Sequence, residues 1–177
     1  MPSGDRTRPT TDRVREALFS AIAAWAGTSM RPADQALAGL GFCDLYAGSG
    51  AVGLEAASRG AEPVLLVEAD RRTAAVARGN SGELGLPARV QTARVEAVLR
   101  APAPGAFDII FADPPYDVST DQVDQQLTDV LGGGWVADHG LVVVERSRRT
   151  PDLSWPDTVT ERWQRAYGET VLHFGAR

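Results

Sequence analysis

Four consecutive residues, Asp113-Pro114-Pro115-Tyr116, place a carboxylate, two rigid imino acids and an aromatic ring directly after the apolar run Phe107 to Ala112. Proline fixes φ near about −65° and has no N–H, so neither proline can extend a strand or enter a helix interior. The chain must therefore leave the predicted strand in a stiff turn that presents the carboxylate, backbone carbonyls and the ring. In open α/β sheets, ligands bind at this carboxyl-terminal edge. By itself the motif fits either a structural turn or part of a ligand site.

A second motif lies upstream, where Gly48-x-Gly50-x-x-Gly53 follows the apolar run Gly41 to Tyr46. Such glycines let the backbone approach a cofactor closely, and Glu68, which ends the next apolar run, is spaced to bind a ribose diol. Both a nicotinamide dinucleotide (NAD) and S-adenosylmethionine (SAM) could use this arrangement. Asp44 and Tyr46 favour SAM, because a carboxylate ahead of the glycines suits a cationic amino-acid group and would repel a pyrophosphate.

The elements that would position both motifs alternate along the chain. We expect a first helix that starts after Pro9, with Thr10 or Thr11 as its cap. The spacing of apolar residues predicts strands over 41–46, 63–67, 89–92, 107–112 and 141–145, a helix that follows Gly53 and runs to about residue 59, helices over 71–83 and 118–131, and two further strands near 158–163 and 170–174. This order predicts one α/β domain, residues 1–177, with a doubly wound, mostly parallel sheet and an antiparallel edge.

Composition narrows the class of protein further. The chain has 177 residues and a net charge of −5, and all 18 of its basic residues are arginine. A local basic patch can still serve an acidic protein, so arginines would make any phosphate contacts. The single cysteine, Cys43, excludes an intramolecular disulfide, and with only two histidines we expect no metal site. No apolar run approaches the roughly 18 residues of a membrane span, so we expect a cytoplasmic protein with no membrane partner.

Five segments in this order resemble one family closely. They are RPTTDRVREALF (8–19), DLYAGSGAVGLEAASRGA (44–61), LLVEAD (65–70), ADPPY (112–116) and VVVERS (142–147). They resemble the RsmD-type bacterial 16S ribosomal RNA guanine-N2 methyltransferases, and the N-terminal segment is the most discriminating. The resemblance implies a class I SAM-dependent methyltransferase fold: a seven-stranded, mostly parallel sheet with an antiparallel edge strand and helices on both faces. It also implies methyl transfer from SAM to N2 of a guanine, with S-adenosylhomocysteine as the second product.

The resemblance assigns site residues by position. The implied SAM contacts are Asp44, Tyr46, Ala47, Gly48, Ser49, Gly50, Glu68 and Ala69, with Asp113 at the methyl-transfer end. Related enzymes often place Asp or Asn after the third strand to bind the adenine amino group. Arg94-Val95 occupies that place here, so we expect adenine to rest on the backbone of Val95 and on apolar packing. The implied catalytic residues are Asp113, Pro114, Pro115 and Tyr116.

The implied partner is 16S rRNA in the small ribosomal subunit or a late assembly intermediate, bound by a monomer. Arginines would contact a single-stranded loop, the usual target of sequence-specific RNA recognition. The candidates flank the first helix and follow the fifth strand: Arg8, Arg13, Arg15, Arg146, Arg148 and Arg149. Residues 1–27 are thus expected to contribute to RNA contact, although a solvated surface is the competing interpretation for each arginine. Family chains usually begin with a basic, glycine-rich segment, whereas this sequence starts almost at RPT.

Four alternatives remain open from the sequence. An N6-adenine DNA methyltransferase and a protein-glutamine methyltransferase share the Pro-Pro-Tyr motif, usually with Asn before it. An NAD-dependent oxidoreductase could use the glycine turn. A SAM-fold protein that binds RNA without catalysis would not require Asp113 and Tyr116.

Overall fold

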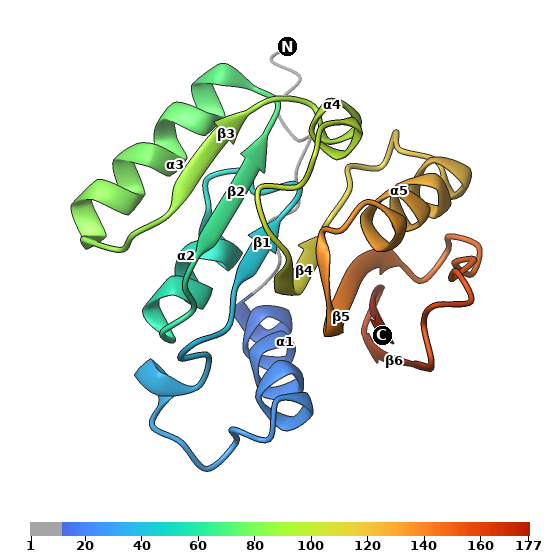
Figure 1. Cartoon of the computed structure of the whole chain (residues 1–177), viewed down its shortest axis with the longest axis horizontal. Helices are drawn as coiled ribbons and strands as arrows, with labels where there is room; N and C mark the ends of the chain where they lie inside the picture. Colours follow the sequence, from blue (N-terminus) through green and yellow to red (C-terminus); the bar gives the residue numbers. More distant parts are fainter. Residues whose placement is uncertain (1–11) are drawn as a thin grey trace.

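A computed structural model of the chain describes residues 12–177 (Figure 1). Its elements, in chain order, are α1 (Asp12–Trp25), a 3-10 turn η1 (Ala33–Gln35), β1 (Phe42–Asp44), α2 (Ala51–Ser58), β2 (Val64–Glu68), α3 (Arg71–Leu84), β3 (Arg89–Thr92), α4 (Val95–Arg100), β4 (Phe107–Ala112), α5 (Thr120–Gly132), β5 (Val136–Ser147), β6 (Glu161–Tyr167) and β7 (Thr170–Ala176). The predicted alternation of strands and helices is confirmed. The predicted cap at Thr10 or Thr11 lies outside the described residues.

All seven strands form one sheet, in the order β3-β2-β1-β4-β5-β7-β6. Strands β1 to β5 are parallel, and β7 runs antiparallel to both of its neighbours, β5 and β6. The predicted seven-stranded, mostly parallel sheet is therefore confirmed. The reversed strand, however, lies one place in from the edge, and β6 is the edge strand. The tight hairpin at Gly168 (φ 61°) forces β6 and β7 to be antiparallel, and the long β5–β6 connection lets β6 lie outside β7.

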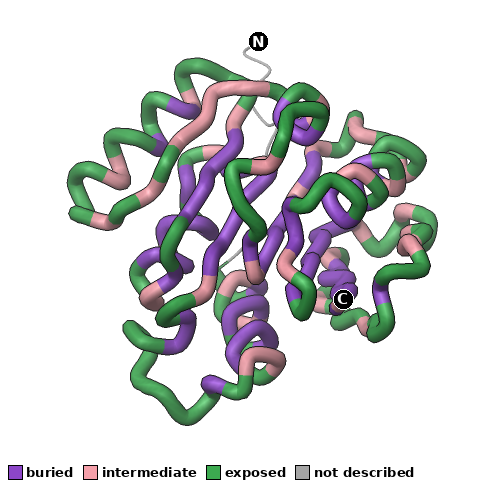
Figure 2. Tube along the Cα trace, in the orientation of Figure 1, coloured by how far each residue is buried: buried purple, intermediate pink, exposed green. Residues whose placement is uncertain are grey.

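Helices cover both faces of the sheet, and each face has its own apolar core. Leu18 and Ile22 of α1 pack with α2 against one face, which includes Phe42, Leu66 and Phe111. The other face packs against α4 and α5; its buried residues include Cys43, Leu65, Ile110, Val123 and Leu127. Figure 2 shows the inner strands as the most continuously buried part of the chain, because parallel strands covered on both faces are apolar throughout. Within the described part of the chain, no helix has both the length and the apolarity to span a membrane.

The strand order creates a topological switch point beside β1. From β1 the chain passes outward to β2 and then β3, and it returns to β4 on the opposite side of β1. The connections that follow β1 and β4 therefore lead away from each other, and in such sheets the carboxyl ends of the strands at this point are the usual ligand site. The loop from residue 26 to 41 lies at the other end of the sheet, at the bottom of Figure 1.

Candidate active site

Strand register brings the sequence-predicted residues to one edge of the sheet. Asp44 on β1 pairs with Leu66 on β2 and with Phe111 on β4. Glu68 is the last residue of β2, two residues beyond Leu66, and Asp113 directly follows the last residue of β4. Residues two apart on a strand point to the same face, so the Glu68 side chain follows the face to which Leu66 belongs. The two motifs thus follow the carboxyl ends of the adjacent parallel strands β1 and β4, on either side of the switch point.

Asp44 is a buried carboxylate with unused hydrogen-bonding capacity. Asp44 is only 1% exposed, and its Oδ1 atom has no hydrogen-bond partner. Burial raises the pKa of Asp44 to about 7, with the charges of Glu68 and Glu145 adding to the rise and backbone N–H bonds from Tyr46 and Gly53 opposing it. A buried acceptor in this state is suited to a cationic partner, which would satisfy Oδ1 and favour the ionised form.

Hydrogen bonds and steric contacts fix the conformation of the glycine turn, residues 47–53. The Ala47 N–H donates to the Val67 carbonyl (2.9 Å), and Glu68 Oε2 accepts from the Gly48 N–H (2.9 Å). Gly48 (φ 55°) and Gly50 (φ 90°) have the left-handed backbone that favours glycine, and a Cβ on Gly53 would overlap the Leu66 side chain. The three glycines of the motif therefore meet local steric demands.

A residue that the sequence interpretation missed also holds this turn. The Asn80 amide on α3 donates to the Ser49 carbonyl (3.0 Å). The contact joins positions 31 residues apart, so no local pattern signals it. Ser49 and Ala69 are exposed, whereas Ala47 is buried.

The Asp-Pro-Pro-Tyr segment forms the stiff turn that its sequence predicts. The Val118 N–H donates to the Pro115 carbonyl (3.0 Å), which closes the turn. Ser119 then caps α5 through a capping box with Gln122. Tyr116 is 73% exposed, whereas Pro114 is buried. The Pro115 carbonyl is therefore used within the turn, and the Pro114 carbonyl comes directly after Asp113 in the chain.

A partly buried chain of polar side chains joins the end of β1 to α4 and α5. The Tyr46 hydroxyl donates to Gln126 Oε1 (2.8 Å), and Gln126 Nε2 donates to Glu96 Oε1 (3.2 Å). Burial raises the pKa of Tyr46 to about 12, which keeps the phenol protonated and able to donate. Gln126 and Glu96 were not predicted as site residues. The signal for Gln126 is its place among the buried, helically spaced Val123, Leu127 and Val130.

Comparisons with known proteins agree with this geometry. The family model described as "Conserved hypothetical protein 95" matches residues 1–176. The Ribosomal RNA small subunit methyltransferase D of Escherichia coli K12 is 34% identical over 146 residues, which cover 82% of this chain and 67% of that protein. The chain belongs to the RsmD family.

Solved structures support the same assignment. A hypothetical protein of Thermus thermophilus has a TM-score of 0.73 at 34% identity, covering 98% of this chain and 90% of that chain. The 16S rRNA N2 G1207 methyltransferase (RsmC) of the same species, solved with AdoMet and guanosine, has a TM-score of 0.69 at 21% identity. That alignment covers 99% of this chain and 44% of RsmC, and it supports the fold. The fold is that of class I SAM-dependent methyltransferases.

Arg94 and Val95, the predicted region of adenine recognition, lie at the start of α4. Val95 is buried in the first turn of α4 and packs in the apolar cluster of that face. The Arg94 side chain is 84% exposed and makes only a long contact with Glu96 (3.9 Å) among the ion pairs of the described residues. Recognition through the Val95 backbone and apolar packing therefore stays a prediction.

The predicted RNA-contacting arginines of this RsmD-family chain fall into four groups, the last of which is Arg15 alone. Arg13, Arg148 and Arg149 are exposed, and Arg149 pairs with Glu169 (3.2 Å). Arg146 is buried at the end of β5, so it does not form part of an exposed RNA surface; it packs beneath the loop after Tyr116 because its side chain follows the α4/α5 face. Arg8 lies outside the described residues.

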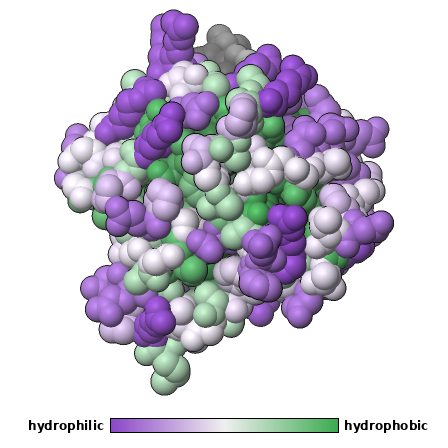
Figure 3. All heavy atoms as spheres, viewed as in Figure 1, coloured by the Kyte–Doolittle hydropathy of each residue, from purple (hydrophilic) through white to green (hydrophobic). Residues whose placement is uncertain are grey.

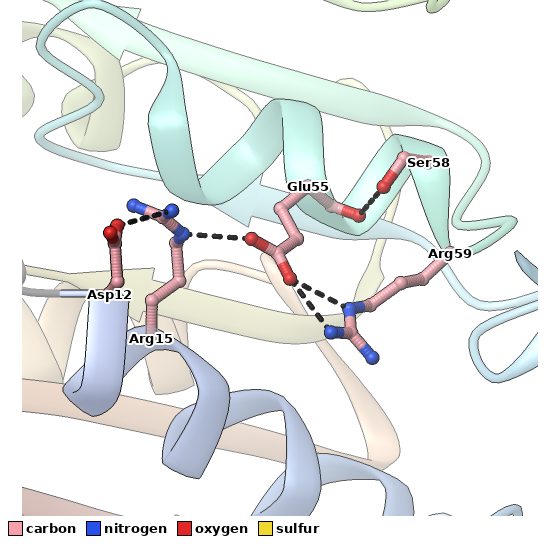
Figure 4. A network of polar contacts seen from close by, with 5 residues as sticks. All are labelled: Asp12, Arg15, Glu55, Ser58 and Arg59. Atoms are coloured by element: carbon pink, nitrogen blue, oxygen red, sulfur yellow. Dashed lines mark hydrogen bonds and ion pairs between the residues drawn. The ribbon is translucent and has the colours of Figure 1, made fainter. Parts of the chain in front are cut away.

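Arg15 forms a structural contact between α1 and α2. Its Nε donates to Glu55 Oε2 (2.8 Å) and its Nη2 to Asp12 Oδ1 (2.8 Å), while Arg59 binds the second oxygen of Glu55 (2.7 Å). Figure 4 shows Glu55 between the two arginines. Arg59 also lies over the Phe19 ring, 4.7 Å from its centroid. Arg15, in the part of the RPT-DRVRE motif that the structure describes, thus attaches α1 to the helix that begins at the glycine turn.

Proposed function

We propose that this protein transfers a methyl group from SAM to the exocyclic N2 of a guanine in 16S rRNA. One observation carries the proposal: an RsmD-family chain presents Glu68, Asp44 and Asp113 at the carboxyl ends of the adjacent strands β2, β1 and β4. The first two suit a cofactor with a ribose and a cationic group, and the third suits an amine. The name of the E. coli relative supports ribosomal RNA as the substrate.

The residues present fit SAM as the methyl donor. The unpartnered Oδ1 of Asp44 suits its cationic amino-acid group, and the open space at Gly48 permits close approach to the backbone. Glu68 already accepts the N–H groups of Gly48 and Asp70 (2.9 and 2.7 Å). Each carboxylate oxygen keeps a further lone pair for a ribose hydroxyl. When bound, SAM supplies an electrophilic methyl group on a sulfonium centre.

The acceptor side must hold a weakly nucleophilic amine. The lone pair of a guanine N2 is delocalised into the ring, so the nitrogen must be held with that lone pair directed at the methyl group. The Asp113 carboxylate and the Pro114 carbonyl can accept its two N–H bonds. This arrangement is positioning together with electrostatic stabilisation of the positive charge that develops on nitrogen. The amine becomes acidic only after methylation, so no early proton transfer to Asp113 is required.

Tyr116 and the exposed arginines supply the RNA side of the proposal. The exposed Tyr116 ring can stack on a guanine that is unpaired or flipped out of its stack. Arg13, Arg148 and Arg149 are exposed and available to phosphates. We extend the proposal to a monomer that acts on the small subunit or a late assembly intermediate, with residues 1–27 contributing to RNA contact.

Labelling tests the proposal directly. Small subunits from a strain that lacks the enzyme would be incubated with the purified protein and methyl-labelled SAM, and the RNA digested to nucleosides. N2-methylguanosine at one position of 16S rRNA is the expected product. Label in DNA, in protein or in N6-methyladenosine would overturn the proposal, and tight binding of NAD without SAM would do the same.

A further inference from the structure

Arg146 is a buried cation at the carboxyl end of β5. The methyl-transfer chemistry proposed above does not use it. Arg146 lies on the α4/α5 face with Val142 and Val144, and is 7% exposed. Its Nη2 donates to the Val118 carbonyl (3.1 Å), and its Nε has no partner. Burial lowers the pKa of the Arg146 guanidinium, and the negative charge of Asp113 is the largest opposing influence.

The carbonyl that Arg146 holds belongs to the turn that carries Tyr116. Val118 closes this turn through its N–H, which donates to the Pro115 carbonyl (3.0 Å), and Arg146 holds the same residue through its carbonyl. Val118 is thus bound on both sides of its backbone. The turn spans Pro115 to Val118, so the direction of the Tyr116 ring depends on this anchor.

The far end of the turn is also anchored. Ser119 begins α5 with a capping box, and Gln126 on α5 binds the Tyr46 hydroxyl of β1 (2.8 Å). The segment from Asp113 to Ser119 therefore runs from β4 to α5, and α5 is itself hydrogen-bonded to the end of β1 through Gln126 and Tyr46. Arg146 supplies the one described side-chain contact to the carbonyl of Val118, between these two ends.

Stability alone explains Arg146 poorly. Burying a cation is unfavourable unless its hydrogen bonds are complete, and a protein with an apolar side chain of similar volume in its place is often as stable or more so. Here one guanidinium donor is unpaired. The buried charge of Arg146 is therefore better explained by the geometry that it imposes on the turn than by a gain in stability.

We propose that Arg146 is a positioning residue for methyl transfer, which fixes the turn from Pro115 to Val118 and so orients Tyr116 beside Asp113. The inference rests on the proposed function, because it assigns Arg146 a role in holding the acceptor base. Arg146 acts through Val118 and Tyr116, without contact with the reacting atoms.

The test uses Arg146→Met, which keeps an unbranched aliphatic side chain and removes the positive charge and the planar guanidinium group. We expect kcat on small subunits to fall about tenfold or more, since small misplacements of a reacting group carry penalties of that order. SAM affinity should stay within about twofold, and the urea midpoint of unfolding should be unchanged or higher. Arg31→Met is the matched control, because Arg31 is an exposed arginine in the loop at the opposite end of the sheet.

A double mutant separates positioning from a general structural role. If Arg146 acts through Tyr116, then Arg146→Met should reduce kcat less than about threefold in a Tyr116→Ala background. Arg146→Lys, which keeps the charge without the planar fork, should have intermediate kcat.

Each outcome decides the inference. A kcat within about twofold of wild type for Arg146→Met, a fully multiplicative loss in the double mutant, or a variant that fails to fold would overturn it. Wild-type protein that forms no N2-methylguanosine would instead overturn the proposed function, so the two failures are distinguishable.

Discussion

Replacing Asp44 by asparagine should change the pH dependence of stability. Burial raises the pKa of Asp44 from 3.8 to about 7. Between these values the folded protein holds a proton that the unfolded chain has released. The free energy of unfolding of the protein without SAM therefore falls as pH rises through this window, and above about pH 7 the full penalty of the buried charge is present.

The magnitude follows from the size of the shift. A rise from 3.8 to about 7 corresponds to roughly 4 kcal/mol in total, of which about 2.5 kcal/mol falls between pH 5 and pH 8. Asparagine does not titrate, so the variant lacks this loss. Its amide NH₂ would occupy the place of the unpartnered Oδ1, at a cost that does not depend on pH and cancels between the two pH values.

Urea unfolding at pH 5 and pH 8, without SAM, measures the effect. The difference in unfolding free energy, Asp44→Asn minus wild type, should rise by about 2.5 kcal/mol from pH 5 to pH 8. Asp138→Asn, at an exposed position on β5, is the matched control and should show no such rise. Parallel pH profiles for wild type and Asp44→Asn would refute the reasoning.

The same substitution has a second readout in cofactor binding. If Asp44 holds the cationic group of SAM, wild-type affinity for SAM should increase from pH 5.5 to pH 7 and binding at pH 6 should release a proton. Calorimetry in two buffers of different ionisation enthalpy measures that release. The Asp44→Asn variant should bind SAM more weakly and without proton release; retained affinity would place the cation elsewhere.

Two further substitutions test other parts of the site. Asp113→Ala should abolish methyl transfer while SAM affinity by calorimetry changes less than about tenfold, or ~1.4 kcal/mol, because Asp113 is assigned to the amine; a much larger loss would reassign it to the cofactor. Glu55→Ala should lower the free energy of unfolding by roughly 2 kcal/mol, because it leaves the half-buried Arg15 and Arg59 without their shared carboxylate. Asp12→Ala is the control: its side chain is 95% exposed, and urea unfolding should show a change below about 0.5 kcal/mol. Equal effects at the two positions would contradict this account of the network.

The fold was predictable because its signals are local. The strand Phe107–Ala112 has the bounds that the sequence predicts, since an apolar run between Gly and Pro residues leaves little freedom. Helix α3 likewise starts at its predicted residue and stops at Gly85 in the left-handed conformation. The position of β7 inside the edge was not predictable, because hairpin strands β6 and β7 show no local signal for which one pairs with β5.

The polar parts of the site were less predictable because their partners are distant in sequence. Tyr46 and Gln126 are 80 residues apart, and Arg15 and Glu55 are 40 apart. Helical spacing places Val14 on the buried face of α1, with Arg13 and Arg15 on its two flanks. It does not reveal which flank faces α2. The burial of Arg146 depends likewise on the loop that covers it.

Polarity is uneven over the surface and at the catalytic edge. Figure 3 shows hydrophilic side chains around the rim of one face and apolar side chains nearer its centre. The charges of Glu68 and Glu145 both raise the pKa of Asp44, so carboxylates are close enough at this edge to repel one another.

The negative charges of these carboxylates repel one another when no cation is bound, and a bound cation is attracted to all of them. This edge of the sheet favours a cofactor that carries a sulfonium and an ammonium group, and it disfavours phosphate close to Asp44. We therefore expect RNA phosphates to be held at a distance, by exposed arginines such as Arg148 and Arg149, with only the base reaching Asp113. Methyl transfer removes the sulfonium charge, so the same carboxylates should hold S-adenosylhomocysteine less tightly than SAM. The repulsion that raises the pKa of Asp44 would in this way favour binding of the methyl donor and release of the spent cofactor.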